Sequence, residues 1–99
     1  MKVTKIIATA NEIRIEILGL CPDANAVARA FVPLLCCNSK DKTPGRLVFE
    51  SKNAQNDGFV LPRCVDGYDL LICRFEIEID GKKLDGVRYV TDFGDDFSK

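Results

Sequence analysis

The acidic residues of this 99-residue chain are the first candidates for chemistry. Glu76 and Glu78 are two positions apart, and in an extended strand such side chains point to the same side of the sheet. A pair of carboxylates can hydrolyse a glycosidic bond when the two flank it inside a cleft. The residues around this pair alternate between apolar and charged types, which predicts a solvated strand face and no cleft. We therefore expect both glutamates to face solvent and to protect the sheet from aggregation.

A second acidic group follows Thr91, where Asp92 opens the sequence Asp-Phe-Gly-Asp-Asp. Asp-Phe-Gly occurs in protein kinases, but the glycine-rich loop, strand lysine and catalytic loop that accompany it there do not occur in this chain. Asp92, Asp95 and Asp96 could bind a hard cation, which takes several oxygen ligands, yet their spacing is not that of an EF-hand loop. A solvated acidic terminus is the preferred interpretation, and no metal or other cofactor is expected.

The cysteines indicate a reducing compartment. There are five of them, an odd number without a Cys-x-x-Cys motif, and the adjacent pair has poor geometry for a disulfide or a zinc site. The N-terminus has no apolar run long enough for a signal peptide, and no stretch approaches the ~20 apolar residues of a membrane span. We expect a cytoplasmic protein, or a secreted one if a signal peptide has been removed. The thiols are expected to behave mostly as small buried hydrophobes: Cys21, Cys36, Cys37, Cys64 and Cys73.

The composition excludes several function classes. The chain has 14 basic and 15 acidic residues and a net charge of -1, which disfavours phosphate-driven nucleic-acid binding. It has no histidine, so histidine-based acid–base catalysis, Ser-His-Asp triads and histidine metal sites are all excluded. It has no tryptophan, so a surface for sugar stacking depends on other aromatic side chains. The candidates for contact with a ligand or a neighbouring domain are Tyr68, Tyr89 and Phe59, and no catalytic residue is expected.

Strands are the elements that must position these side chains. Ile13, Ile15 and Ile17 alternate with charged residues, which is the two-residue period of a half-buried strand over 12–19. The β-branched segment 3–8 precedes this strand and is expected to form a hairpin with it. Segment 26–35 is ambiguous, because its alanines suit a helix while Pro33 removes a backbone donor inside it. An edge or bulged strand is preferred there, and two further short strands are expected over 46–50 and 59–61.

The longest predicted strand covers 68–80. Residues 70–73 are apolar on both faces, which predicts strand structure covered on both sides. Asp80-Gly81 favours a hairpin turn, Asp85-Gly86 offers a second turn, and 87–93 is expected to be the return strand. Four side chains share the inward register of the long strand: Cys73, Phe75, Ile77 and Ile79.

About seven short strands separated by turn signals predict an all-β fold. We expect an immunoglobulin- or fibronectin-III-like β-sandwich over residues 1–93, with 94–99 as a frayed C-terminus or the start of a linker. Tyr68 is a candidate tyrosine-corner residue whose hydroxyl would bond back toward Pro62.

Three segments of the second half resemble a known family. They are Gly-Phe-Val-Leu-Pro-Arg over 58–63, Tyr-Asp-Leu-Leu-Ile-Cys-Arg-Phe over 68–75, and Gly-Val-Arg-Tyr-Val-Thr-Asp over 86–92. The chain is similar in these segments to the N-terminal region of a bacterial family of unassigned function, in which a β-sandwich leads into a glycosidase-like (β/α)8 barrel. The first half matches that family only in its isoleucine-rich paired strands.

The resemblance implies a non-catalytic accessory module of a carbohydrate-active enzyme, which packs against a barrel C-terminal to it. The alternative is a stand-alone module that binds carbohydrate or protein. A docking module should expose a contiguous apolar patch, whereas a sugar binder should expose aligned aromatic rings. In both cases the chain itself is expected not to be an enzyme.

Overall fold

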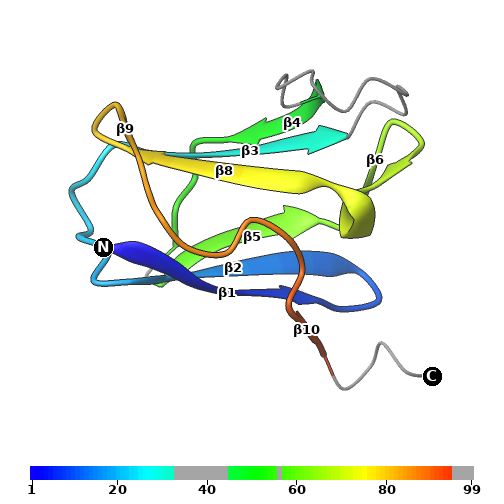
Figure 1. Ribbon diagram of the computed structural model, residues 1–99, viewed down its shortest axis with the longest axis horizontal. Helices are drawn as coiled ribbons and strands as arrows, with labels where there is room; N and C mark the ends of the chain where they lie inside the picture. The colour runs from blue at the N-terminus through cyan, green and yellow to red at the C-terminus, as the bar shows by residue number, and fades with distance from the viewer. Residues whose placement is uncertain (33–44, 56, 95–99) are drawn as a thin grey trace.

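The computed structural model describes residues 1–32, 45–55 and 57–94 of the chain. Two four-stranded sheets pack face to face in an all-β sandwich (Figure 1). Sheet A has the order β10-β1-β2-β5, and sheet B has the order β4-β3-β8-β9. The all-β sandwich predicted from the spacing of turns and alternating segments is thereby confirmed.

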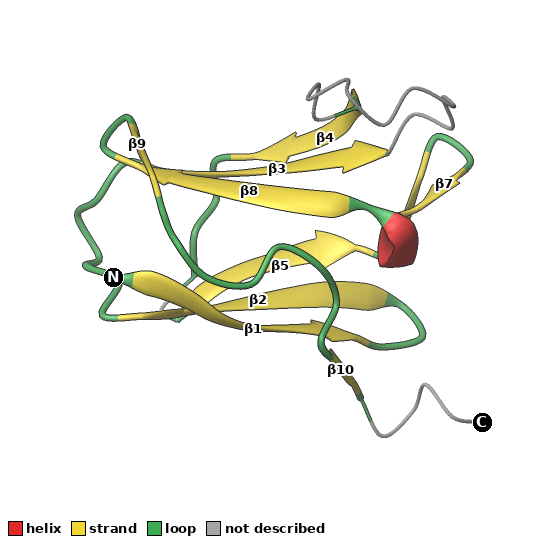
Figure 2. Ribbon diagram, in the orientation of Figure 1, coloured by secondary structure: helices red, strands yellow, loops and turns green. Residues whose placement is uncertain are grey.

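The strands of sheet A are β1 (Lys2–Ala8), β2 (Glu12–Leu18), β5 (Gly58–Pro62) and β10 (Asp92–Phe93). Those of sheet B are β3 (Ala26–Val32), β4 (Arg46–Ser51), β8 (Arg74–Ile79) and β9 (Lys82–Lys83). A small hairpin of β6 (Cys64–Val65) and β7 (Tyr68–Asp69) connects β5 to a single 3-10 turn, η1 (Leu70–Ile72) (Figure 2).

The core lies between the two sheets and follows the predicted alternation. In β2, Ile13, Ile15 and Ile17 are buried, and the hairpin with β1 pairs Ile6 with Ile15. The ambiguous segment is a strand over Ala26–Val32, as predicted, and its register against β4 shifts between Ala30 and Phe31. The prediction of an edge strand is wrong, because β3 lies inside sheet B and its backbone pairs with both β4 and β8. Its alternate alanines are buried between the sheets. The largest fully buried side chains are those of Phe59, Phe75, Ile6, Ile13, Ile15, Leu61, Leu70 and Cys73.

The long strand predicted over 68–80 is wrong in its first half. Residues 70–72 form a 3-10 turn, and Ile72 is 59% exposed instead of being covered on both faces. A local polar contact causes the turn, because the Asp69 carboxylate accepts from the Leu71 N–H while the Cys73 N–H donates to the Leu70 carbonyl. The second half, β8, has the predicted inward register from Phe75 to Ile79.

The predicted return strand over 87–93 is also wrong for most of its length. Asp80-Gly81 makes the expected hairpin turn, but β9 ends at Lys83. Residues 84–91, here called the strap, then cross from sheet B to the outer edge of β1 and lead into β10, which runs parallel to β1 (Figure 1).

The strap is bonded to both sheets. The Val3 N–H donates to the Asp85 carbonyl and the Val87 N–H donates to the Val3 carbonyl, so the predicted second turn at Asp85-Gly86 instead pairs in parallel with β1. The Phe75 N–H of β8 donates to the Arg88 carbonyl at 2.8 Å. The edge groups of β1 therefore find partners in the strap, and this pairing replaces a regular antiparallel ladder with β8.

Candidate functional site

The three aromatic residues predicted from the sequence lie on three separate elements. Phe59 of β5 points into the core and is 2% exposed, so its ring offers almost no surface to a ligand. Tyr68 of β7 is half-buried, and its hydroxyl is 3.4 Å from Arg46 Nη1, so its hydrogen-bond partner lies on β4 and not near Pro62. Tyr89 stands on the strap and is 56% exposed.

The last described strand adds a second exposed aromatic residue to the same segment of the chain. Phe93 of β10 is 58% exposed and follows Tyr89 by four positions. Phe93 is not among the contact residues predicted from the sequence. Two strongly exposed aromatic rings on one segment are what a contact surface requires. Gly94 donates its N–H to the Ala8 carbonyl, while residues 95–99 of the predicted frayed end lie outside the described residues.

The two glutamates of β8 share the outer face of sheet B, as their spacing predicts, but they are not simply solvated. Glu76 accepts from Arg74 and from Lys83, each at 3.0 Å, and its side chain is only 9% exposed. Burial alone would raise the pKa of Glu76, but the hydrogen bonds from Lys83 and Arg74 outweigh it and lower that pKa. Glu78 pairs with Arg29 at 2.8 Å. Both carboxylates are thus neutralised within the sheet face.

The acidic C-terminal group is described only at Asp92. Its carboxylate lies 3.2 Å from the Thr91 hydroxyl, whose single proton can be donated either to that carboxylate or to the Ile6 carbonyl at 3.3 Å. Asp95 and Asp96 lie outside the described residues. Within 1–32, 45–55 and 57–94, no group of three or more Cys, Asp or Glu residues is placed to hold a metal ion.

Arg63 forms a second cluster that joins three segments. Its Nε and Nη2 bind the two oxygens of Asp69 at 2.7 and 3.1 Å, and its Nη1 donates to the Thr9 carbonyl at 2.7 Å. The hydrogen bond from Arg63 is the main reason that the pKa of Asp69 is lowered, helped by the Leu71 N–H. These contacts fix the β6–β7 hairpin and η1 against the β1–β2 turn. Arg63 is a structural residue in this arrangement.

The three described cysteines differ in their exposure to solvent. Cys21 and Cys64 are exposed, so the expectation that the thiols are mostly buried is wrong for these two. Cys73 is buried, as predicted, and burial raises the pKa of its thiol to about 11. It does not lie in a long strand as predicted, because it follows η1 and directly precedes β8. Cys36 and Cys37 lie outside the described residues.

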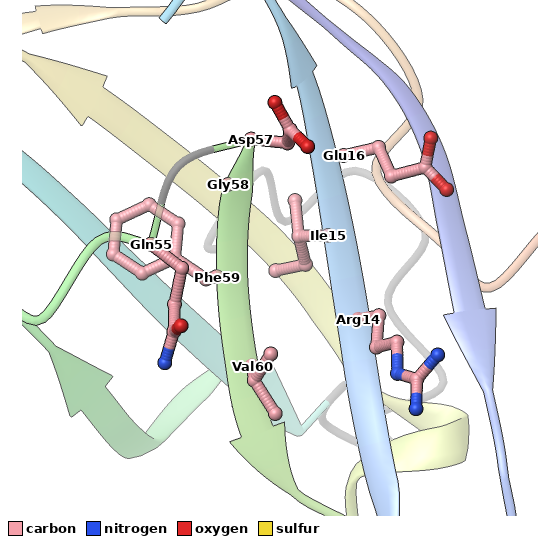
Figure 3. Close-up of a pocket in the computed structure, with 8 residues that line it drawn as sticks. All are labelled: Arg14, Ile15, Glu16, Gln55, Asp57, Gly58, Phe59 and Val60. Carbon is pink, nitrogen blue, oxygen red and sulfur yellow. The ribbon is translucent and has the colours of Figure 1, made fainter. Parts of the chain in front are cut away.

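A shallow hollow of about 430 Å³ lies over β2 and β5 (Figure 3). Gly58 lies at its base, because this residue has no side chain on the outer face of sheet A. A Cβ atom at Gly58 would lie 1.7 Å from the Ile15 carbonyl oxygen, so β5 can only approach β2 this closely with glycine there. Around it stand the side chains of Arg14, Glu16, Gln55, Asp57 and Val60.

Sequence reasoning missed this hollow. Asp57-Gly58 is a turn dipeptide in the sequence, and such a dipeptide gives no sign that the glycine packs on a neighbouring strand. The positions that face the hollow from β2 are the charged half of an alternating strand, which is the pattern of any solvated face.

Comparisons with protein-family models, with curated proteins and with solved structures found no match to this chain. In the part of the chain that the structure describes, there is no helix long and apolar enough to cross a membrane.

Proposed function

We propose that this chain is a non-catalytic β-sandwich module that packs against a neighbouring protein domain through the strap and β10. The observation that carries the proposal is the exposure of Tyr89 and Phe93, at 56% and 58%, on one continuous segment at the edge of sheet A. Aromatic side chains are enriched where protein surfaces meet, since they bury a large area and lose little conformational freedom. The strap can also hold them rigidly, because its backbone is bonded to both sheets.

The state of the carboxylates supports a non-catalytic role. A general acid or a nucleophile must reach its substrate, but Glu76 is held by Arg74 and Lys83 and is nearly inaccessible. Glu78 is engaged by Arg29, which also binds Glu50 at 2.8 Å. These ion pairs stabilise the outer face of sheet B instead of presenting reactive groups.

The strand order supports an immunoglobulin-like assignment, which we propose as the finer description of the fold. The core of sheet A, β1-β2-β5, corresponds in order to strands A, B and E of that fold. Sheet B, β4-β3-β8-β9, corresponds to C′, C, F and G. From the resemblance of the second half we propose that the neighbouring domain is a C-terminal, glycosidase-like barrel of a bacterial carbohydrate-active enzyme with a cytoplasmic location.

The second candidate function is a stand-alone module that binds carbohydrate or protein. The hollow over Gly58 favours it, because this hollow faces away from the core on sheet A and is lined by hydrogen-bonding side chains. The two candidates use different surfaces, namely the edge of β1 in the first and the outer face of β2 and β5 in the second.

The reading frame downstream of Lys99 provides the first test. An in-frame barrel would support the accessory module, whereas a stop codon directly after Lys99 would overturn it and leave the stand-alone module. If a barrel follows, hydrogen exchange can be compared between the 99-residue chain and the longer protein. We expect the amides of 88–93 to exchange more slowly in the longer protein and the amides of η1 to exchange equally in both. Equal exchange over 88–93 would reject this docking surface.

A further inference from the structure

The hollow over Gly58 has the size of a ligand site. Pockets for small ligands enclose about 300–1,000 Å³, and this one encloses about 430 Å³. A second hollow of about 240 Å³ adjoins it, since Glu16 and Asp57 line both. The second hollow continues along β2 to Thr4, Leu18 and Gly19. The two together form an elongated depression, here called the β2 groove, on the outer face of sheet A.

The β2 groove presents both hydrogen-bond donors and hydrogen-bond acceptors. Glu16 and Asp57 supply carboxylate oxygens. Gln55 carries both an amide donor and an amide acceptor. Arg14 stands beside them as a donor, held in place by Glu12, which accepts from its Nε and Nη2 at 3.1 and 2.8 Å.

The free edge of β5 adds one backbone donor and one backbone acceptor. The Ile17 N–H donates to the Asp57 carbonyl, so alternate residues from Asp57 onward direct their backbone groups toward β2. Gly58 therefore faces the free edge, where it exchanges hydrogen bonds with Gln55. Val60 faces the same edge two residues later, and its side chain is 43% exposed.

The same edge is too short to pair with another strand. Gly58 is already bonded to Gln55 on one side of Val60, and Pro62 has no N–H on the other. An added peptide strand would find both a donor and an acceptor at one residue only, Val60, because Pro62 offers its carbonyl alone. A small or chain-like polar ligand can use those two backbone groups, but an extended β-strand cannot, and this separates the β2 groove from a peptide-binding edge.

We infer that the β2 groove binds a neutral, hydroxyl-rich ligand, namely an oligosaccharide. A hydroxyl group both donates and accepts, so a row of hydroxyls matches a surface that offers both donors and acceptors. Val60 offers the apolar contact that a sugar ring makes with its C–H face, and the length of the groove accommodates more than one ring. The inference rests on the second candidate function and is independent of docking through Tyr89 and Phe93.

The test is a titration of the isotopically labelled chain, followed by amide NMR, with three neutral probes: maltohexaose, cellohexaose and xylohexaose. We expect one of them to shift the amides of 14–18, of Gln55 and of 57–60 in a saturable manner. Glu16→Gln and Asp57→Asn should each weaken that binding by about tenfold, since each loses a hydrogen bond to a charged acceptor. Glu50→Gln, which removes a carboxylate from the outer face of sheet B, is the matched control and should leave the affinity unchanged.

Three results would overturn the inference. The first is that none of the three saccharides shifts these amides, and the second is that the shifts lie on another surface. The third is that spermidine, a cation without hydroxyl groups, produces the same shifts while the saccharides do not, because the groove would then be only a charged patch. Tyr89→Ser and Phe93→Ser should not change saccharide binding, so failure of the docking surface and failure of the groove can be told apart.

Discussion

At the scale of single residues, the structure shows how strongly position decides the chemistry of one side-chain type. Cys21, Cys64 and Cys73 are the same group in three places, and only Cys73 is enclosed by the core. The thiolate is the reactive form of cysteine, and burial in apolar surroundings disfavours it. Exposure therefore sets the reactivity of these thiols, and the apolar alternation from Cys73 through Phe75 to Ile79 predicts the burial of Cys73 although Cys73 itself lies just before β8.

We predict that Cys73 is the last of the described cysteines to be alkylated. Its pKa of about 11, against an ordinary 9.0, leaves about a hundredfold less thiolate at neutral pH than an unperturbed thiol has. Brief iodoacetamide treatment of the native chain, followed by mass spectrometry of peptides, should modify Cys21 and Cys64 first. Cys73 should react only when denaturant is added. Equal labelling of all three in the native state would show that Cys73 is not enclosed by the core.

At the scale of elements, the apolar pattern of a segment can favour a strand while a polar side chain beside it caps a turn in the same residues. Segment 70–73 has the apolar composition of a buried strand, but Asp69 caps a turn there and leaves Ile72 in solvent. The cap can form because Arg63 orients the Asp69 carboxylate from a position six residues earlier. No periodicity in the sequence reports that contact, whereas the regular alternation of β2 and β8 predicted their buried faces correctly.

We predict that two substitutions on either side of Cys73 differ strongly in their effect on the free energy of unfolding. Phe75 is 1% exposed, and Phe75→Ala should lower the free energy of unfolding by about 3–5 kcal/mol, a large share of the roughly 5–15 kcal/mol of a whole domain. Ile72 is 59% exposed, and Ile72→Ala should change it by only about 0.5 kcal/mol. Urea unfolding followed by circular dichroism measures both. A loss at Ile72 as large as that at Phe75 would favour a strand over 70–73.

We predict that Asp69 contributes to stability in a pH-dependent manner. The pKa of its carboxyl lies below the ordinary 3.8 in the folded chain, so its contribution is complete at higher pH and is lost as the pH falls through the folded value. Asp69→Asn should cost about 1 kcal/mol at neutral pH, since solvent screens a half-exposed pair. It should also make the fall in stability below pH 3.8 less steep.

The matched control for this prediction is Asp66→Asn at the tip of the same hairpin, where asparagine tolerates the positive φ of 49°. Unfolding by urea should be measured across the acidic range for both variants. The pKa of Glu76 is also lowered, so some acid sensitivity will persist in Asp69→Asn. If the free energy of unfolding falls equally steeply with decreasing pH in the wild type and in Asp69→Asn, the assignment is contradicted.

At the scale of the whole molecule, the strap decides how the sandwich closes. The sequence predicted two layers of strands and most of their inward residues, because alternation is a property of each segment by itself. It did not predict that 84–91 leaves sheet B for β1, since that choice depends on unpaired edge groups of Val3 far away in the chain. The hollow over Gly58 was missed for the same reason, because it arises from the contact of β5 with β2.

We predict that Gly86 is indispensable to this closure. A Cβ atom there would lie 2.1 Å from the Val3 carbonyl oxygen, and the φ of 130° is unfavourable for any other residue. Gly86→Ala should cost about 2–6 kcal/mol from strain and overpacking together. Gly81→Ala has a φ of 84° but open space around it, and should cost only about 1–2 kcal/mol. Thermal melts should rank the variants in this order, and the reverse order would mean that the strap does not rest on β1.

The parallel pairing of β1 with residues 85–94 also has a consequence for synthesis on the ribosome. β1 is translated before residues 85–94, which supply the partners of its outer edge, and synthesis proceeds at about 5–20 residues per second. Until then the amide and carbonyl of Val3 and the carbonyls of Ile6 and Ala8 have no partner in the strap or β10. An exposed strand edge can pair with another chain. A nascent chain that stalls before Leu84 therefore exposes the unpaired edge of β1, and this edge can pair with another nascent copy of the chain.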